Sequence, residues 1–379
     1  MAEDFVYLDN SATTKPCDRA VSYMTECAKN NWGNPSSLHI CGINAEVAVE
    51  NARQTAAKLL GVSEDEIYFT SGGTESNNIA VLGAVHAKKR LGKKCVTTAI
   101  EHPSVLEAFK QLESEGFSVV YLKPDENGTV PLCEFKSAID QDTVLVSSML
   151  VNNETGAVLP VGEIKKIIKQ NGSNALLHCD CVQAFGKTEI SAKRLGVDLV
   201  SASAHKIHGV KGTGILFVDR NARINPTVFG GGQEKGLRSG TENTVGIAAL
   251  LGAMEEINIK SDFEKVSKLN GYLREKLSQT EDIEINSSAD CLPYILNFSV
   301  LGYRSEILLH YLESMGVYVS SGSACAKGNG SYVLNAMGLS SQRVDSALRV
   351  SFSKDNTFSD IDALINAVIS AKQKLKKSK

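Results

Sequence analysis

A short apolar run that ends in a pair of glycines decides the fold of this chain. Residues 66–70 read EIYFT, a composition typical of a buried β-strand, and residues 71–74 read SGGT and open directly into a helical pattern. Glycines allow a backbone to approach an anion closely, and the free N–H groups at the start of a helix attract negative charge. The stretch therefore predicts a strand–turn–helix unit that either binds an anion or simply makes a tight turn.

The same alternation of strand and helix patterns continues through the first two-thirds of the chain. Six further strands are expected at 95–100, 118–122, 143–149, 175–179, 198–202 and 214–218. Helical patterns are expected between most of the strands, at 45–60, 75–90, 104–114, 133–140, 162–170 and 191–195. Alternating strands and helices predict βαβ units, and strands that are apolar almost throughout are typical of a sheet covered on both faces. We therefore expect an α/β protein with a mainly parallel, seven-stranded sheet.

The pattern changes near residue 261. A glycine-rich stretch and a helix expected at 245–257 come first, and longer helices with isolated strands follow. These strands are expected at 294–300, 317–320 and 347–352. A chain of 379 residues is long enough for two domains or three. We expect a large α/β domain over residues 15–260 and a smaller α+β domain built from residues 1–14 and 261–379.

Composition and charge exclude several classes of protein. The 40 Lys and Arg residues nearly balance the 43 Asp and Glu residues, which excludes a nucleic-acid binder driven by bulk charge. No apolar run approaches the roughly 20 residues of a membrane helix, and no secretory signal pattern is present. The nine cysteines contain no CxxC pair and indicate free thiols in a reducing compartment. We expect a cytoplasmic protein that binds neither nucleic acid nor membrane directly.

Polar side chains follow several predicted strands at the edge where ligands bind. In an open parallel sheet, ligands lie beyond the carboxyl ends of the strands. The side chains found there are Glu101, His102, Asn152, Asn153, Glu154, Asp180, Gln183, Ser203, His205 and Lys206. A lone histidine is more often structural, and a lone lysine is usually solvated. Their convergence at one edge of one sheet, together with the turn at 71–74, predicts a binding site.

Pyridoxal phosphate (PLP) is the cofactor that fits these residues. No GxGxxG follows a strand, as NAD would require, and the ATP phosphate-loop pattern lacks its first glycine, where Cys181 stands. PLP needs a lysine for a Schiff base, an acid on its ring nitrogen and an anion pocket. Lys206, Asp180 and the turn at 71–74, with Ser203 and His205, supply all three.

The run HCDC at residues 178–181 does not predict a metal site. Period-2 alternation puts His178 and Asp180 on one face of the strand and both cysteines on the other. The chain also lacks the CxxC spacing of common zinc sites. We expect no bound metal.

A loop after the strand expected at 317–320 carries the candidate nucleophile, Cys325. The loop is small, polar and rich in glycine, which is typical of an exposed segment. Cysteines are usually buried, and the nearby Lys327 favours the thiolate form of an exposed one. The alternative is an incidental surface thiol.

These pieces resemble the NifS-type cysteine desulfurases, which belong to the class-V aminotransferases and to PLP fold-type I. The resemblance runs from Tyr7 to about Phe352. The motifs that carry it are YLDNSATT (7–14), GNPSS (33–37), FTSGGTESNN (69–78), EHPSV (101–105), VNNETG (151–156), DCVQAFGK (180–187), SAHKIHG (203–209), GGGQEKGLRSGTEN (230–243) and SSGSAC (320–325).

The resemblance implies a role for each candidate residue. Lys206 would carry PLP as a Schiff base, His102 would stack on the ring and shuttle protons, and Cys325 would be the sulfur-accepting nucleophile. Contacts with the cofactor are implied for Gly73, Thr74, Asn153, Asp180, Gln183, Ser203, His205 and, from the partner subunit of a homodimer, Thr241. Contacts with the substrate carboxylate are implied for Asn34, Asn153 and Arg349.

The implied reaction converts L-cysteine into L-alanine and leaves a persulfide on Cys325. An acceptor protein would take this sulfur for iron–sulfur cluster assembly or tRNA thiolation. A selenocysteine lyase or another PLP-dependent transferase or lyase remains open as an alternative. So does a PLP-fold subunit without catalytic activity that acts as a sulfur-carrier partner or regulator.

Overall fold

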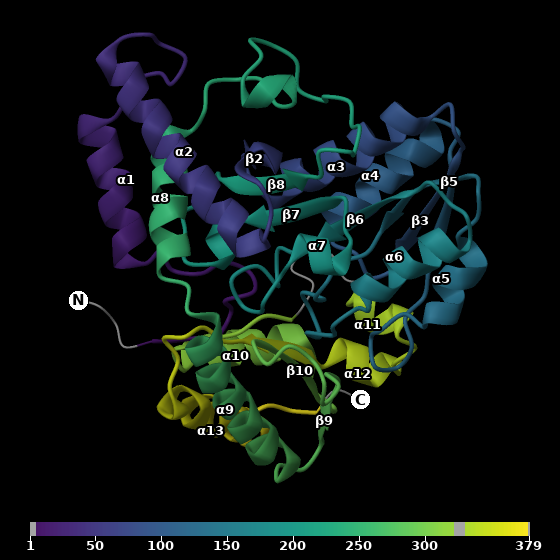
Figure 1. Ribbon diagram of the computed structural model, residues 1–379. Helices are drawn as coiled ribbons and strands as arrows, with labels where there is room; N and C mark the ends of the chain where they lie inside the picture. Colours follow the sequence, from purple (N-terminus) through teal and green to yellow (C-terminus); the bar gives the residue numbers. More distant parts are fainter. Residues whose placement is uncertain (1–4, 322–329, 378–379) are drawn as a thin grey trace.

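The computed structural model describes residues 5–321 and 330–377 (Figure 1). The predicted nucleophile, Cys325, lies outside the described residues. Within the described ranges, no helix combines the length and the apolar character that crossing a membrane requires.

The centre of the molecule is a seven-stranded sheet with the strand order β2-β8-β7-β6-β5-β3-β4. Its strands are β2 (Ile67–Thr70), β3 (Lys94–Thr98), β4 (Ser118–Leu122), β5 (Thr143–Ser147), β6 (Leu176–Asp180), β7 (Leu199–Ser203) and β8 (Gly214–Val218). The strands from β7 to β4 pair in parallel, whereas β8 pairs antiparallel with both β7 and β2. The prediction of a mainly parallel α/β sheet is confirmed.

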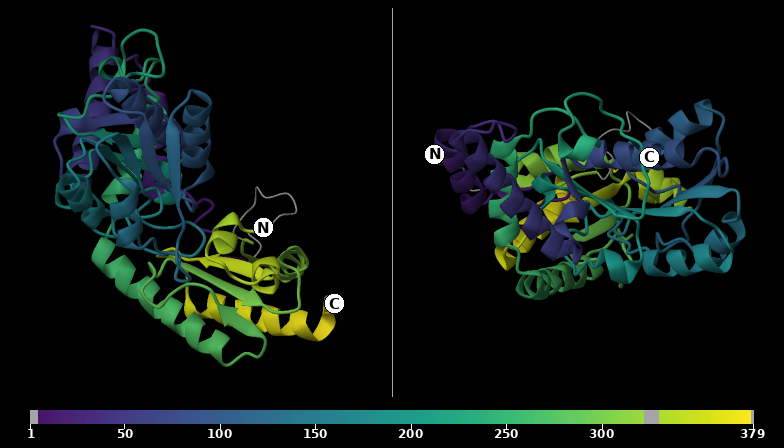
Figure 2. Two further views of the ribbon diagram at one scale, coloured as in Figure 1. Left: turned by 90° about the vertical axis from the view of Figure 1, so that its right-hand side faces the viewer. Right: turned by 45° about the horizontal axis from the view of Figure 1, so that its top comes forward.

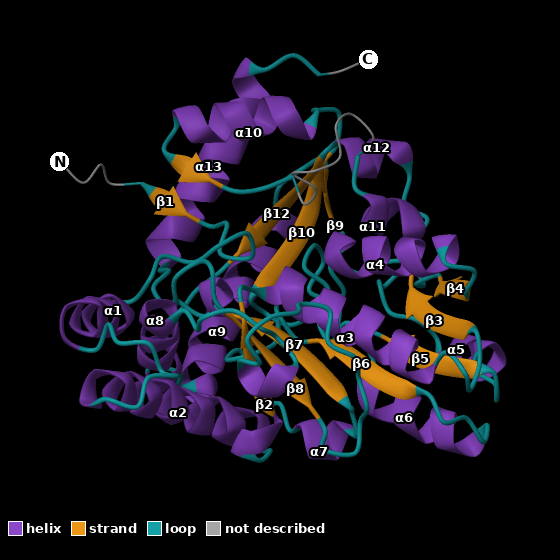
Figure 3. Cartoon of the chain, turned by 90° about the horizontal axis from the view of Figure 1, so that it is seen from above, coloured by secondary structure: helices purple, strands orange, loops and turns teal. Residues whose placement is uncertain are grey.

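Helices cover both faces of this sheet (Figures 1 and 3). They are α1 (Asp18–Asn30), α2 (Ile40–Leu60), α3 (Gly73–Lys88), α4 (Pro103–Ser114), α5 (Leu132–Ala138), α6 (Val161–Gln170), α7 (Ala192–Leu195) and α8 (Thr244–Glu255). Neighbouring residues of one strand enter opposite cores: Leu145 belongs to the core that contains residues of α3 and α4, and Val146 belongs to the core that contains residues of α2, α6 and α8. Burial of each such side chain contributes about 1.5–3 kcal/mol to the free energy of unfolding.

Two helices near the N-terminus differ from the sequence prediction. Helix α2 begins at Ile40 rather than at residue 45, because the side chain of His39 caps it by accepting from the N–H of Gly42. Helix α1 was not predicted, because only Ala20 and Cys27 of its residues are buried and its apolar pattern is correspondingly weak.

The C-terminal third forms a second, smaller group of elements, which lies below the large sheet in the left panel of Figure 2. Its three-stranded antiparallel sheet has the order β12-β10-β9. The elements are α9 (Ile259–Ser278), β9 (Ile283–Ile285), β10 (Ile295–Val300), α10 (Ser305–Ser314), β11 (Val317–Tyr318), α11 (Tyr332–Ala336), α12 (Ser341–Asp345), β12 (Ala347–Ser351) and α13 (Phe358–Lys374). The N-terminal strand β1 (Val6–Tyr7) pairs in parallel with β11, so the start of the chain joins this group.

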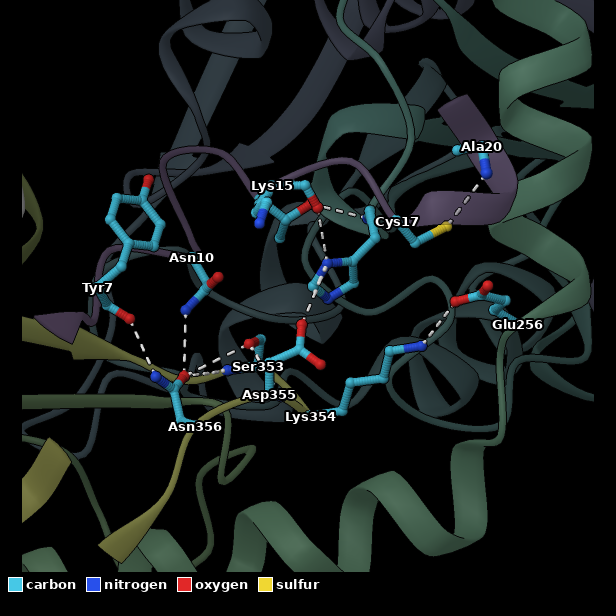
Figure 4. A network of polar contacts seen from close by, with 12 residues as sticks. Tyr7, Asn10, Lys15, Cys17, Ala20, Glu256, Ser353, Lys354, Asp355 and Asn356 are labelled. Atoms are coloured by element: carbon cyan, nitrogen blue, oxygen red, sulfur yellow. Dashed lines mark hydrogen bonds and ion pairs between the residues drawn. The ribbon is translucent and has the colours of Figure 1, made fainter. Parts of the chain in front are cut away.

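Polar contacts fix the segment after β12 to both groups of elements (Figure 4). The amide nitrogen of Asn356 donates to the carbonyl oxygen of Tyr7 at 3.0 Å, and its amide oxygen accepts from Asn10 at 3.3 Å. Lys354 forms an ion pair with Glu256, directly after α8, at 3.1 Å. These contacts hold the carboxyl end of β12 against the large sheet.

Candidate active site

A cavity of about 680 Å³ lies beyond the carboxyl ends of β5, β6 and β7. The N-terminal segment and β12 close its other side. The predicted site residues that line it are Gly73, Thr74, His102, Asn153, Asp180, Gln183, Ser203, His205, Lys206 and Arg349. The structure therefore brings together most of the residues that the sequence placed at one sheet edge, and adds Arg349 from the smaller group. Glu101 and Asn152 are fully buried and do not line the cavity.

Two predicted site residues lie apart from this cavity. Asn34 is exposed in the loop between α1 and α2, and Thr241 is exposed in the loop before α8. The loop that carries Thr241 is anchored at its earlier residue Glu234 by a buried ion pair. The carboxylate of Glu234 accepts from Arg53 at 2.9 and 3.0 Å. Within a single chain, neither Asn34 nor Thr241 reaches the cavity.

Lys206 is the amine of the cavity. It ends a short 3-10 helix, η2 (Ala204–Lys206), that follows β7 directly. Its Nζ donates to the carbonyl oxygens of Ser11 at 2.5 Å and Ala12 at 2.7 Å. Burial, with the nearby Arg349 charge, lowers the pKa of Lys206 to about 8. A larger fraction of this amine is therefore neutral near pH 8, which is the form that attacks a carbonyl group.

Asp180 is the carboxylate of the cavity and stands at the end of β6. Its Oδ1 accepts from the N–H of Val182 at 2.9 Å, and its Oδ2 accepts from the side chain of Asn77 at 2.8 Å. Asp180 is buried with 4% of its surface exposed, so these two donors fix the direction of the carboxylate. The acid is suited to hold a protonated ring nitrogen in the cavity.

His102 caps the start of α4 with its imidazole ring. Its Nδ1 accepts from the N–H of Ser104 at 3.2 Å and lies 2.8 Å from the hydroxyl oxygen of the same serine. Burial lowers the pKa of His102, which favours the neutral ring.

The start of α3 forms a cradle that suits a phosphate group. A Cβ atom at Gly73 would lie 2.7 Å from Cγ2 of Val182, so no side chain fits there. Gly72 has a φ of 152°, which L side chains rarely adopt. Ser203 and His205 line the same cavity, and burial lowers the pKa of His205 to about 4. Helix N–H groups, a hydroxyl and a neutral imidazole together form a donor set for an anion.

Both polar atoms of the Gln183 amide form hydrogen bonds. Its Nε2 donates to the carbonyl oxygen of Ser11 at 3.0 Å, and its Oε1 accepts from Nζ of Lys187 at 3.1 Å. Lys187 is buried, and burial lowers its pKa to about 7. The sequence did not mark Lys187 as important, because its neighbours are revealed only when the domains pack together.

Arg349 enters the cavity from β12. One guanidinium nitrogen pairs with Oδ1 of Asp9 at 2.8 Å, and another donates to the carbonyl oxygen of Asn153 at 3.0 Å. Its Nε, together with Oγ of Ser11 and Oδ1 of Asn153, is buried with no hydrogen-bond partner among the residues described. Buried polar atoms rarely stay unpaired, so these atoms fit a polar ligand in the cavity.

Sequence reasoning missed four residues that shape this site: Asp9, Ser11, Asn77 and Ser104. Asp9 and Ser11 belong to an N-terminal segment that precedes every strand of the large sheet, so the strand-end rule did not reach them. Asn77 could have been found, because it stands one helical turn after Gly73 and therefore faces the same side of α3.

Comparison with known proteins agrees with this geometry. The family model described as "Aminotransferase class-V" matches residues 6–364. A "NifS/IcsS protein homolog" from Lactobacillus delbrueckii subsp. bulgaricus is 43% identical over 96% of this chain and 96% of its own length. "Cysteine desulfurase IscS" from Clostridium botulinum is 39% identical over 96% of this chain and 93% of its own length. The solved structure of a "NIFS-LIKE PROTEIN" covers 98% of this chain and 100% of its own, with 37% identity and a TM-score of 0.93.

Proposed function

Because the chain belongs to the class-V aminotransferase family, we propose that it is a PLP-dependent cysteine desulfurase. The observation that carries this proposal is that one cavity joins the amine of Lys206, the carboxylate of Asp180 and the cradle at Gly73. The named relatives and the NifS-like fold support the same activity. The expected products are L-alanine and a sulfur atom held as a persulfide on Cys325.

The residues of the cavity fit the cofactor from three sides. Lys206 would hold PLP covalently, Asp180 would pair with its ring nitrogen, and Gln183 would face its ring hydroxyl group. Its phosphate would lie against Gly73, Thr74, Ser203 and His205. When bound, PLP supplies an electron sink for the Cα of an amino acid.

The other side chains bind and orient the amino acid. Arg349 would hold the substrate carboxylate in two-pronged fashion, with Asn153 beside it. Lys206 would move the proton at Cα, for which a partly neutral amine is suited. The Cys325 thiolate would attack the substrate sulfur, so that an S–S bond forms and the C–S bond breaks. The electron pair of that bond stays with the substrate carbon, which takes a proton and becomes the methyl group of alanine.

We also propose a homodimer. Large apolar side chains are exposed at and just before the start of α2, with Leu38 at 96%, Ile40 at 66% and Val47 at 54%. Several large apolar side chains exposed in one segment are typical of a surface that a protein partner covers. In such a dimer, Thr241 would contact the phosphate in the partner's cavity, and Asn34 would lie near the substrate. Mass determination by light scattering tests the assembly.

The remaining proposals follow from the sequence. Residues 15–260 form the large domain, and residues 1–14 and 261–379 form the small domain that carries the Cys325 loop. The protein works in the cytoplasm and passes sulfur to an acceptor protein for iron–sulfur cluster assembly or tRNA thiolation. Persulfide mass spectrometry on proteins that co-purify with the chain identifies the acceptor.

The activity is tested with Cys325→Ala. The PLP-loaded variant should lose alanine and sulfide production from L-cysteine while it keeps the visible absorption of the bound cofactor. Full sulfide release by this variant contradicts the role of Cys325. Alanine release from selenocysteine but not from cysteine by the unsubstituted protein identifies a selenocysteine lyase instead.

A further inference from the structure

A chain of hydrogen bonds joins His102 to Asp180 through two buried side chains. Oγ of Ser104 lies 2.8 Å from Nδ1 of His102. Nδ2 of Asn77 donates to that Oγ at 2.9 Å and to Oδ2 of Asp180 at 2.8 Å. Asn77 is 1% exposed, so water does not compete for these bonds. The amide of Asn77 therefore contacts Asp180 directly and reaches His102 through Ser104.

The donor and the acceptor of each hydrogen bond between His102 and Asp180 can be assigned. The backbone N–H of Ser104 can only donate, and it points at Nδ1 of His102, so Nδ1 is an acceptor and carries no proton. The amide of Asn77 cannot be flipped, because its oxygen would then face the Asp180 carboxylate. Its Oδ1 is instead buried with no partner among the described residues. Since Oγ of Ser104 accepts from Asn77, its own hydrogen is available for Nδ1 of His102.

We propose that Asn77 is a positioning residue that fixes Asp180 directly and, through Ser104, fixes His102 as the neutral imidazole protonated at Nε2. His102 lines the cavity, so this form presents a hydrogen-bond donor to whatever lies there. A thiolate or carboxylate of the substrate is then stabilised in preference to an uncharged thiol. The inference rests on the proposed cofactor site, because Asp180 and His102 act together only there.

The charged groups around His102 support the neutral form. Asp180 from β6 raises the pKa of His102 and Lys206 from η2 lowers it, but burial is the largest effect and lowers it. Glu101, which precedes His102, has a pKa raised to about 8 by burial, so it brings little negative charge at pH 7. Protonation of His102 would also place a hydrogen on Nδ1 and break its bonds from Ser104.

The first test measures the protein with Asn77, Ser104 and His102 unsubstituted, and a variant is used only to assign a signal. Imidazole ¹⁵N spectra of the histidine-labelled protein, recorded with and without PLP, report the tautomer of each of the seven histidines. His102→Gln assigns the signal of His102. We expect the pattern of a ring protonated at Nε2, still neutral at pH 6.5. A ring protonated at Nδ1 overturns the proposal.

The second test uses Ser104→Ala and Asn77→Leu to separate the path from Asn77 to His102 from the bond between Asn77 and Asp180. Ser104→Ala removes the hydroxyl that donates to the neutral ring and should raise the pKa of His102 by roughly 0.5–1. Asn77→Leu removes the donor that orients this hydroxyl, so it should raise the pKa of His102 by no more than that. The double variant should show no larger rise than Ser104→Ala, because the hydrogen bonds of Asn77 reach the His102 ring only through Ser104 and the Asp180 charge is present in every variant. The visible absorption of bound PLP should shift in Asn77→Leu alone, because only that variant loses the bond to Asp180.

Asn78→Leu is the matched control on the same helix. Among the described residues, the side chain of Asn78 donates hydrogen bonds to the backbone carbonyls of Ser104, at 3.3 Å, and Thr74, at 2.9 Å, and to no side chain, so the pKa of His102 should not change. Additive effects of Ser104→Ala and Asn77→Leu, or an unchanged His102 in Ser104→Ala, contradict the proposal. If PLP binds and these shifts appear but cysteine yields no sulfide, the proposed function fails while this inference stands.

Discussion

Asp9 holds the guanidinium of Arg349 at 2.8 Å, although the two residues are 340 positions apart in the chain. Only 6% of the Arg349 side chain is exposed, against 21% for Asp9, so the pair is shielded from solvent and from salt. The Asp9 carboxylate thereby fixes one edge of the guanidinium, while Nε, which has no partner in the described part of the chain, remains for a ligand.

We predict that Asp9→Ala raises the KM for L-cysteine about 10-fold, because a hydrogen bond to a charged group contributes about 1.5–3 kcal/mol. Arg349→Lys should raise the KM at least as much, because lysine cannot form a two-pronged pair with a carboxylate. Asp355→Ala is the control, because Asp355 lies near His208 and does not contact Arg349. An equal KM in Asp9→Ala and Asp355→Ala contradicts this prediction.

The rate at which the cofactor-free protein combines with PLP should rise with pH, with its midpoint near pH 8. The reason is the lowered pKa of Lys206, about 8, since only the neutral amine reacts. Stopped-flow absorbance between pH 6 and 10 measures the rate. Lys211→Met, which removes an exposed lysine nearby, should leave the midpoint unchanged. A midpoint near 10 shows that Lys206 is not desolvated as described.

Lys187 should make folding stability depend on pH. Its pKa is about 7 in the folded protein and near 10.5 when unfolded, so between these values the unfolded chain binds more protons. Its contribution to the free energy of unfolding therefore rises with pH across this window, by up to about 1.4 kcal/mol per pH unit. Urea unfolding of the cofactor-free protein at pH 7 and 9 should show a smaller rise in Lys187→Met. Lys193→Met, at an exposed position, should behave like the unsubstituted protein.

Gly73→Ala should weaken PLP binding at least about 10-fold, because its new methyl group would lie 2.7 Å from Cγ2 of Val182 and move the helix start that forms the cradle. The double variant Gly73→Ala/Val182→Ala should recover part of the affinity, because it removes the clashing methyl group. Gly271→Ala in α9 meets no atom within 4 Å, so it should leave PLP affinity unchanged. Fluorescence titration with PLP measures all three variants. Normal affinity in Gly73→Ala alone would exclude the cradle as the phosphate site.

Local signals in the sequence were sufficient for the large sheet and for most of the cavity. Strands such as β5 are buried throughout and have an apolar centre, and polar residues such as Asp180 stand at strand ends, so the strand-end rule located them. The reversed direction of β8 was not predictable, because a run of apolar residues looks the same in either direction. Contacts such as Asp9 with Arg349 depend on how distant segments pack, and no local pattern encodes that packing.

The pairing of β1 with β11 sets the order in which this protein can be completed during synthesis. Strand β1 is synthesised some 300 residues before its partner at Val317. From Ser11 onward the N-terminal segment already contacts Gln183 and Lys206, but until β11 and β12 are made β1 lacks its strand partner and Asp9 lacks Arg349. A nascent chain can therefore build the large sheet first, whereas its catalytic chamber closes only after β11 and β12 have been synthesised.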